Sequence, residues 1–141
     1  MTTSATTSTV ICDIDGTLAK MAGRGPFEWD RVDQDQPNAP VIAVVTALYL
    51  AGHPVILVTG RMEQCRGLTS GWLQKHLPFV RCQLHMRPDD DYRKDAVLKR
   101  QIYDQHLAGL EILCVFDDRA QTVEMWRELG LACFQVAEGN F

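Results

Sequence analysis

Apolar and polar residues follow one another in blocks along the chain, and these blocks predict an alternation of strands and helices. Short runs rich in apolar and β-branched residues, ended by acids, Gly or Pro, predict strands over 9–15, 53–61, 80–87, 110–118 and 132–137. Segments with periodic apolar residues predict helices over 39–52, 63–77, 93–107 and 120–130. Residues 16–38 are rich in Gly, Pro and charge, which predicts a loop or flap.

Strands that alternate with helices predict a parallel sheet covered by helices on both faces. The expected fold class is therefore α/β, a three-layer Rossmann-like sheet. In such sheets the chemistry gathers at the carboxyl ends of the strands. Asp13, Thr59 and Asp117 all fall at such ends.

Length and composition are those of an ordinary soluble domain. The chain has 141 residues, 46% hydrophobic and 23% charged, with a net charge of −4. We expect a disordered, Ser- and Thr-rich start over residues 1–8 and a single domain over 9–141. The charge argues against a protein that coats nucleic acid or anionic membrane, although a local basic groove stays open.

Two further features indicate a cytoplasmic protein without a membrane anchor. The longest mostly apolar stretch, residues 41–51, is too short to span a bilayer. The five cysteines are scattered and form no CxxC pair, which argues against a structural zinc site. Such cysteines in apolar segments are typical of reduced thiols in the core of a cytosolic protein.

Paired acids follow the first strand and the fourth. Asp13 and Asp15 lie one residue apart, so both face one site only if the chain turns after Asp13, which Gly16 permits. Asp117 and Asp118 end the fourth strand. Carboxylate oxygens are ligands that Mg²⁺ prefers. The alternative for the second pair is an N-cap of the helix that follows.

Two other motifs suit a phosphate group. Thr59 and Gly60 offer a hydroxyl and backbone N–H groups at a strand end, although a plain turn would have the same sequence. Lys94 and Asp95 open a predicted helix, where a lysine adds positive charge to the helix dipole. Lys99, further along this helix, competes for the same role.

The four motifs in this order resemble those of the haloacid dehalogenase superfamily of phosphohydrolases. A closer resemblance, from about Val10 to Phe141, is to the 3′-phosphatase domains of the phage polynucleotide kinase/phosphatase family. It rests on the segments "DIDGTLAKMAGRGPFEWD" and "DDRAQTVEMWRELGLACFQVAEGNF", and "GRGP" (23–26) is its most specific part. The resemblance implies a haloacid dehalogenase-like fold with a minimal cap.

The resemblance also implies a two-step phosphoryl transfer. Asp13 is expected to attack phosphorus and form an aspartyl-phosphate, while Asp15 protonates the departing sugar oxygen and later activates water. Mg²⁺ is expected between Asp13, the backbone carbonyl of Asp15, and Asp117 or Asp118. Thr59 and Lys94 complete the catalytic set. The residues expected to bind substrate are Gly16, Arg24, Gly60, Arg61 and Asp95, the arginines through their forked donors.

The implied substrates are 3′-phosphate ends of DNA or RNA, with 2′,3′-cyclic phosphate ends as an extension, in end healing during nucleic acid repair. Phe27, Trp29 and Tyr92 are candidates for base stacking, with ordinary packing as the alternative; Trp126 is assigned to the core. No GxxxxGK[ST] loop occurs, so kinase activity is expected to be absent. By analogy, a homodimer and a separate kinase or ligase are expected partners, in the host cytoplasm if a phage encodes the chain.

Two functions of other classes stay open at this point. A phosphatase for small molecules or nucleotides would carry the same acids, but a short chain with no inserted cap domain leaves an open site that suits a polymer end better. A nucleic-acid-binding module without activity would keep the fold, although intact acids at the strand ends argue against it.

Overall fold

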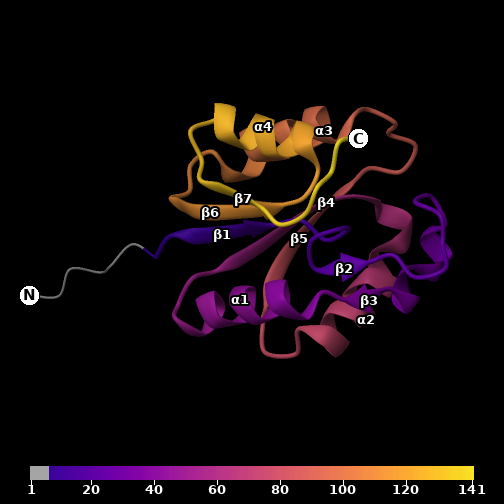
Figure 1. The fold of residues 1–141 in the computed structure, drawn as a ribbon. Coiled ribbons are helices and arrows are strands. Elements are labelled where there is room, and N and C mark those ends of the chain that lie inside the picture. Colours follow the sequence, from indigo (N-terminus) through magenta and orange to yellow (C-terminus); the bar gives the residue numbers. More distant parts are fainter. Residues whose placement is uncertain (1–6) are drawn as a thin grey trace, which may run out of the picture.

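A five-stranded parallel sheet forms the centre of the computed structural model, which describes residues 7–141 (Figure 1). Its strands lie in the order β5-β4-β1-β6-β7. Their bounds are Thr9–Cys12 for β1, Val55–Met62 for β4, Cys82–Arg87 for β5, Ile112–Asp117 for β6 and Cys133–Gln135 for β7. All four pairings are parallel, which confirms the predicted fold class.

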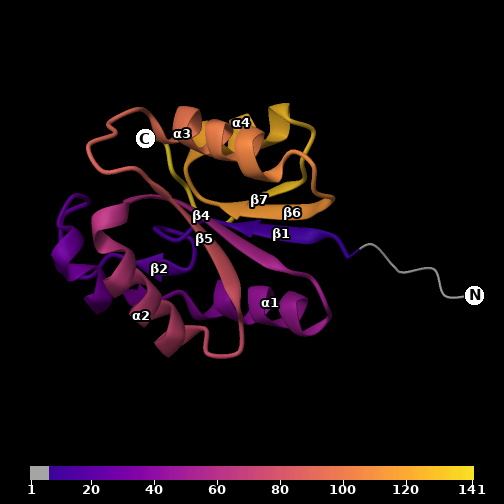
Figure 2. The ribbon, with the colours of Figure 1, turned by 180° about the vertical axis from the view of Figure 1, so that it is seen from behind.

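Two helices cover each face of the sheet, as Figures 1 and 2 show from opposite sides. Helices α1 (Ala39–Leu50) and α2 (Arg66–His76) lie on one face. Helices α3 (Asp95–Ile102) and α4 (Ala120–Glu128) lie on the other. The result is the three-layer arrangement that the alternation of strands and helices predicts.

Strand β1 shows why this sheet is buried on both faces. Val10 and Cys12 pack into the core beneath α1 and α2, while Ile11 between them packs on the side of α3 and α4. All three side chains have no exposed surface. Of the five cysteines, all free thiols, Cys82 alone is not fully buried. The thiols therefore behave as small apolar side chains of the core.

Some predicted boundaries differ from the observed ones. The segment that starts at residue 63 begins with a 3-10 turn, η2 (Glu63–Cys65), before α2. The helix expected over 93–107 starts at Asp95 and ends in a π-helical turn, η3 (Tyr103–Leu107).

The flap, residues 16–38, contains more structure than a loop. A small antiparallel pair, β2 (Ala19–Lys20) with β3 (Gln36–Pro37), encloses the 3-10 helix η1 (Trp29–Gln34). Between β1 and α1 the chain forms nothing larger over the sheet, which agrees with a minimal cap. The flap lies at the carboxyl ends of the strands.

The topology places three strand ends together. β1 is central, and its neighbours β4 and β6 run parallel to it on either side, so the residues after β1 lie beside the ends of both. Of the expected disordered start, residues 1–6 lie outside the described residues, and the division into a tail and a domain over 9–141 stays a prediction. Within residues 7–141, no helix has both the length and the apolar character needed to cross a membrane.

Candidate active site

Three buried carboxylates meet at the ends of β1 and β6. Asp13 follows β1 directly, Asp117 is the last residue of β6, and Asp118 comes next. Each offers an oxygen that lies within 4.8 Å of the others. Burial, together with the negative charge of Asp117, raises the pKa values of Asp13 and Asp118. The two acid pairs of the sequence thus contribute to one cluster.

Lys99 is the cation of this cluster. Its Nζ donates to Oδ1 of Asp13 at 2.8 Å and to Oδ2 of Asp117 at 3.0 Å, and the residue is 1% exposed. Burial would lower its pKa, but the facing carboxylates of Asp117 and Asp13 outweigh burial and raise it. Lys99 therefore stays charged, and one positive charge faces three acids.

The excess of acid over base fits a divalent cation. Oδ1 of Asp117 accepts the backbone N–H of Asp118 at 2.8 Å, and Oδ2 accepts Nε1 of Trp126 at 3.1 Å in addition to Lys99. Asp117 is thus held in place by its own chain. Asp13 and Asp118 have more free lone pairs, and carboxylate oxygens are the donor set that Mg²⁺ takes. Trp126 is buried, as predicted, and it also orients an acid of the cluster.

Gly16 makes the turn after the first strand. Its φ of +80° is one that side chains disfavour, and a Cβ there would collide with the carboxylate of Asp118. The turn brings Thr17 back, so that its Oγ1 donates to Oδ2 of Asp13 at 3.0 Å. Local sequence therefore fixes the orientation of the Asp13 carboxylate.

Asp15 is not part of the acid cluster but of a second network, made of ion pairs with arginines. Its Oδ1 accepts Nη2 of Arg61 at 2.7 Å and Nη2 of Arg24 at 3.1 Å, and its side chain is 30% exposed. The side chains of Arg24 and Arg61 are fully buried. Both arginines thus hold an acid in this structure, and their expected contact with phosphate stays a prediction. The metal contact expected from the Asp15 backbone carbonyl also stays a prediction.

Asp35, which the sequence analysis missed, joins the two arginines. Its carboxylate accepts Nε and Nη2 of Arg24, both at 2.8 Å, and Nη2 of Arg61 at 2.9 Å, with no exposed surface. The backbone carbonyl of Asp35 accepts Nε1 of Trp72 at 2.8 Å. A single acid in a polar flap belongs to no periodic pattern of apolar residues. The sequence therefore did not predict that Asp35 is buried.

The structure separates the two candidate lysines. Lys94 immediately precedes α3, is exposed, and makes no side-chain hydrogen bond or ion pair within residues 7–141. Lys99 lies one turn further on, where the helix faces the sheet. The choice of Lys94 over Lys99 is thus not supported by the geometry. A signal existed: Lys99 is three residues from both Ala96 and Ile102, on the buried stripe.

The remaining predicted residues are Thr59, Gly60 and Asp95. Thr59 is buried, and its Oγ1 accepts the backbone N–H of Arg61 at 3.2 Å. Asp95 accepts Nη2 of Arg87 at 2.6 Å and Nη1 of Arg119 at 3.2 Å, and its expected contact with substrate stays a prediction. A Cβ at Gly60 would collide with Asp95, so this glycine permits the approach.

A cavity of about 620 Å³ opens beside these acids. Asp15, Asp95 and Arg119 line its polar part. Phe27, Trp29 and Tyr92 also line it; Phe27 and Tyr92 are 80% and 79% exposed, whereas Trp29 is half-buried. Large apolar side chains that stay exposed beside a cavity are typical of a binding surface.

Fold and site together define a class of protein. A Rossmann-like sheet that carries Asp13, Asp15, Thr59 and the pair Asp117 and Asp118 toward its strand ends, with Lys99 of α3 against them, is a haloacid dehalogenase-type phosphatase, a phosphoric monoester hydrolase. A Vibrio cholerae structure, named as a 3-deoxy-D-manno-octulosonate 8-phosphate phosphatase, shares this fold with a TM-score of 0.52 at 16% identity, covering 96% of this chain and 68% of its own.

Within that class, a family model described as the polynucleotide kinase PNKP phosphatase domain matches residues 7–141. The chain therefore belongs to the family of PNKP phosphatase domains.

Individual relatives agree with this assignment. A protein of Autographa californica nuclear polyhedrosis virus, named as a bifunctional polynucleotide kinase/RNA ligase, is 38% identical over 125 residues, 85% of this chain. A chain in a structure of the Pnkp1/Rnl/Hen1 RNA repair complex superimposes with a TM-score of 0.91 at 39% identity, over 99% of this chain. The chain spans 18% of the viral protein and 45% of that structure's chain.

Proposed function

We propose that the chain is an Mg²⁺-dependent polynucleotide 3′-phosphatase. The observation that carries the proposal is the buried Asp13 carboxylate, held by Lys99 and Thr17 beside Asp118. A carboxylate in such a setting is a nucleophile with a cation at hand to stabilise negative charge on the phosphoryl group.

In the proposed reaction, an oxygen of Asp13 forms a bond to phosphorus while the bond from phosphorus to the sugar oxygen breaks. The sugar oxygen takes a proton from Asp15. A water molecule then attacks the phosphorus of the aspartyl-phosphate, gives its proton to Asp15, and releases inorganic phosphate with Asp13 restored. The two arginines that bind Asp15 fix the position of its carboxyl group, which lines the cavity.

Mg²⁺ is the cofactor that the acid cluster suits best. Asp13, Asp118 and the backbone carbonyl of Asp15 would hold it, with Asp117 beside them. When bound, the ion offsets the repulsion between a carboxylate nucleophile and a phosphate dianion.

A polynucleotide end is the proposed substrate, as DNA or RNA, with 2′,3′-cyclic phosphate ends included. Family membership and the names of the relatives support it, since these describe a polynucleotide kinase, an RNA ligase and an RNA repair complex. The open cavity supports it too, since Phe27 and Tyr92 offer exposed rings on which bases can stack. The alternative is a small nucleotide.

We propose end healing in nucleic acid repair, in the cytoplasm, as the setting of this activity. A kinase or ligase that acts together with the chain is part of this proposal, supported by the names of the relatives, a polynucleotide kinase/RNA ligase and an RNA repair complex. Self-association as a homodimer is part of the same proposal.

End-labelled DNA and RNA oligonucleotides with a 3′-phosphate test the proposal. We expect release of inorganic phosphate with Mg²⁺, none with EDTA, and none from the Asp13→Asn variant, because its amide is not a nucleophile. Asp33→Asn, an exposed acid on the flap, is the matched control and should keep the activity of the unaltered protein.

Other results would identify another function. A large preference for a free 3′-mononucleotide over an oligonucleotide end would reject the polymer substrate in favour of a nucleotide. If neither oligonucleotides nor a generic aryl phosphate is hydrolysed with any divalent cation, the chain is a binding module.

A further inference from the structure

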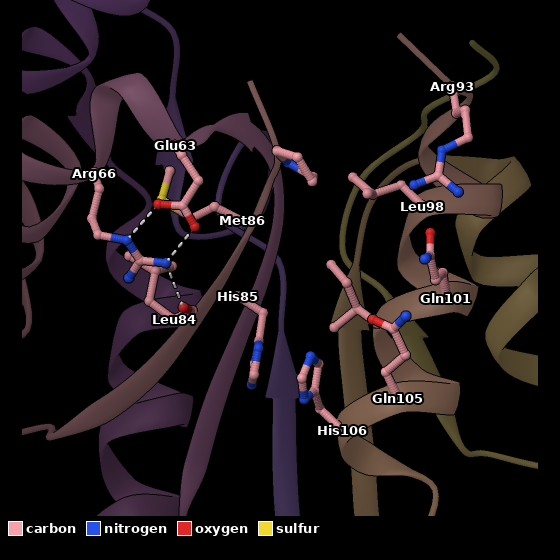
Figure 3. Close-up of a pocket in the computed structure, with 12 residues that line it drawn as sticks. Glu63, Arg66, Leu84, His85, Met86, Arg93, Leu98, Gln101, Gln105 and His106 are labelled. Carbon is pink, nitrogen blue, oxygen red and sulfur yellow. Dashed lines mark hydrogen bonds and ion pairs between the residues drawn. The ribbon is translucent and has the colours of Figure 1, made fainter. Parts of the chain in front are cut away.

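A second cleft lies between the edge strand β5 and the helix α3 with its π turn η3 (Figure 3). Its volume is about 220 Å³. Figure 3 shows His85 on one wall, Gln101 and Gln105 on the other, and His106 beside His85. No residue of the acid cluster lines it. The cleft is therefore separate from the site described above.

Unsatisfied polar atoms concentrate in this cleft. Within residues 7–141, three buried side-chain polar atoms have no hydrogen-bond partner, namely Nε2 of His85, Oε1 of Gln101 and Oγ1 of Thr122. Two of these three belong to residues that line the cleft. A buried polar atom without a partner costs free energy, and native folds seldom keep one without a reason. A ligand with matching polar atoms would satisfy both.

The charged groups around the cleft are already paired. Nε of Arg66 donates to Glu63 at 2.7 Å, and Nη2 of Arg93 donates to Asp91 at 2.6 Å. Burial, the neighbouring His106 and Arg66 lower the pKa of His85, so its ring is neutral at neutral pH. The groups left for a ligand are therefore neutral donors and acceptors, which select a neutral partner.

Apolar side chains make up the rest of the walls. Leu84 and Met86 contribute from β5, and Leu98 and Ile102 from α3. A ligand that fits has a small apolar body with hydrogen-bonding groups along its edge. Nucleobases have this chemistry: flat faces, and donors and acceptors around the ring. We propose that this cleft binds a nucleobase through Gln101 and His85, an inference that rests on the proposed function.

The positions of the two cavities favour an upstream base of the bound polynucleotide as the nucleobase that enters the cleft. Arg93 lines both this cleft and the active-site cavity, so the two hollows flank one short segment, residues 87–95. A strand whose 3′ end lies at Asp15 and Asp13 can cross this segment and place an earlier base in the cleft. A free nucleoside has the same chemistry and is the other source.

Two variants remove the polar atoms and keep the shape. Gln101→Leu replaces the amide by an apolar group of similar size. His85→Phe keeps a ring beside His106, whose centroid lies 4.8 Å away, but has no nitrogen. Because both changes remove a partnerless buried atom, thermal unfolding should occur at the same temperature or higher. Gln74→Leu, an exposed glutamine of α2, is the matched control.

The kinetic experiment uses 3′-phosphorylated oligonucleotides in which one nucleotide at a time is replaced by an abasic residue. In the unaltered protein we expect one upstream position at which base removal lowers kcat/KM about tenfold, the effect of one or two hydrogen bonds. In Gln101→Leu and His85→Phe, kcat/KM should already be lower and base removal there should have no further effect. Hydrolysis of an aryl phosphate should not change.

The binding arm uses ¹H–¹⁵N NMR titration of the unaltered protein with free nucleosides and does not depend on activity. Shifts confined to β5 and α3 that Gln101→Leu abolishes support the cleft even if oligonucleotides are not hydrolysed, so failure of the proposed function is recognised separately. Such shifts without a sensitive abasic position identify free nucleosides as the source. If abasic effects and nucleoside titrations are the same in all four proteins, the proposal is overturned.

Discussion

At the scale of single residues, the position of one lysine decides the electrostatics of the site. Lys99 lies between Asp13 and Asp117, where its charge offsets two buried carboxylates. Lys94 lines the cavity and is exposed. The two lysines are five residues apart, so the same substitution at each separates the two assignments.

We expect Lys99→Met to lower phosphatase activity by about a hundredfold or more, the effect of losing a preorganised cationic donor. Removal of the lysine also leaves two buried acids without a cation and should destabilise the fold by about 3–5 kcal/mol, so activity is measured at a temperature where circular dichroism shows a folded protein. Lys94→Met should change activity by less than tenfold. A larger loss in Lys94→Met than in Lys99→Met would restore the original assignment.

The order of the motifs could not decide between these lysines, although the spacing of Lys99 from the apolar residues Ala96 and Ile102 favours Lys99. Both fall in the segment predicted as a helix over 93–107, and the role depends on where the helix starts. Because α3 begins at Asp95, Lys94 lies just before the helix, whereas Lys99 lies within it and faces the sheet. In contrast, the acids were predictable, since an acid that directly follows a buried strand has only one end of the sheet at which to lie.

At the scale of elements, buried ion pairs hold the flap in place. Asp35 ends η1 and bonds both buried arginines, so the segment that covers the cavity is tied to the end of β4. A buried acid between two cations is costly to remove, because it leaves charge without a partner.

Asp35→Asn should therefore destabilise the protein by about 3–5 kcal/mol. It should also reduce phosphatase activity, because Arg24 and Arg61 would no longer hold Asp15 in place. Urea unfolding followed by tryptophan fluorescence measures the first effect, since Trp72 donates to the carbonyl of Asp35. Asp33→Asn, two residues away and exposed, should change stability by less than about 0.5 kcal/mol. Equal stability of the two variants would show that the buried network contributes little.

Elements of the sheet were more predictable than the flap, for a physical reason. Strands and helices repeat apolar residues with fixed periods, and the five strands of the parallel sheet and the helices α1 to α4 were predicted from them. Residues 16–38 have no such period, so β2, η1 and β3 were missed. Their structure depends on contacts with residues far away in the chain, such as that of Asp35 with Arg61.

At the scale of the whole molecule, the surface next to α1 is unusually apolar. The α1–β7 surface consists of Val44, Leu48, Leu113, Phe116 and Phe134, around a hollow of about 530 Å³. Helix α1 has no charged residue, and Phe134 is 55% exposed. Apolar surface of this kind supports the proposed homodimer.

Sedimentation equilibrium of the unaltered chain should show a dimer, and Phe134→Glu should shift it to a monomer, because dimer formation would bury two new charges. Phe79→Glu makes the same change at a phenylalanine that is 72% exposed elsewhere, and should leave the dimer intact. Activity on an aryl phosphate should be equal in all three. A monomer at every concentration of the unaltered chain would rule out the dimer.

The flap combines a locked base with a free tip: Asp35 is fully buried, whereas Phe27 at the other end is 80% exposed. Substitutions at the tip can accumulate without disturbing the carboxylates that carry out the chemistry. During evolution, the choice of nucleic acid could thus change independently of the ability to cleave a phosphate ester. Engineered libraries aimed at new specificity should vary residues 25–29 and leave Arg24 and Asp35 untouched.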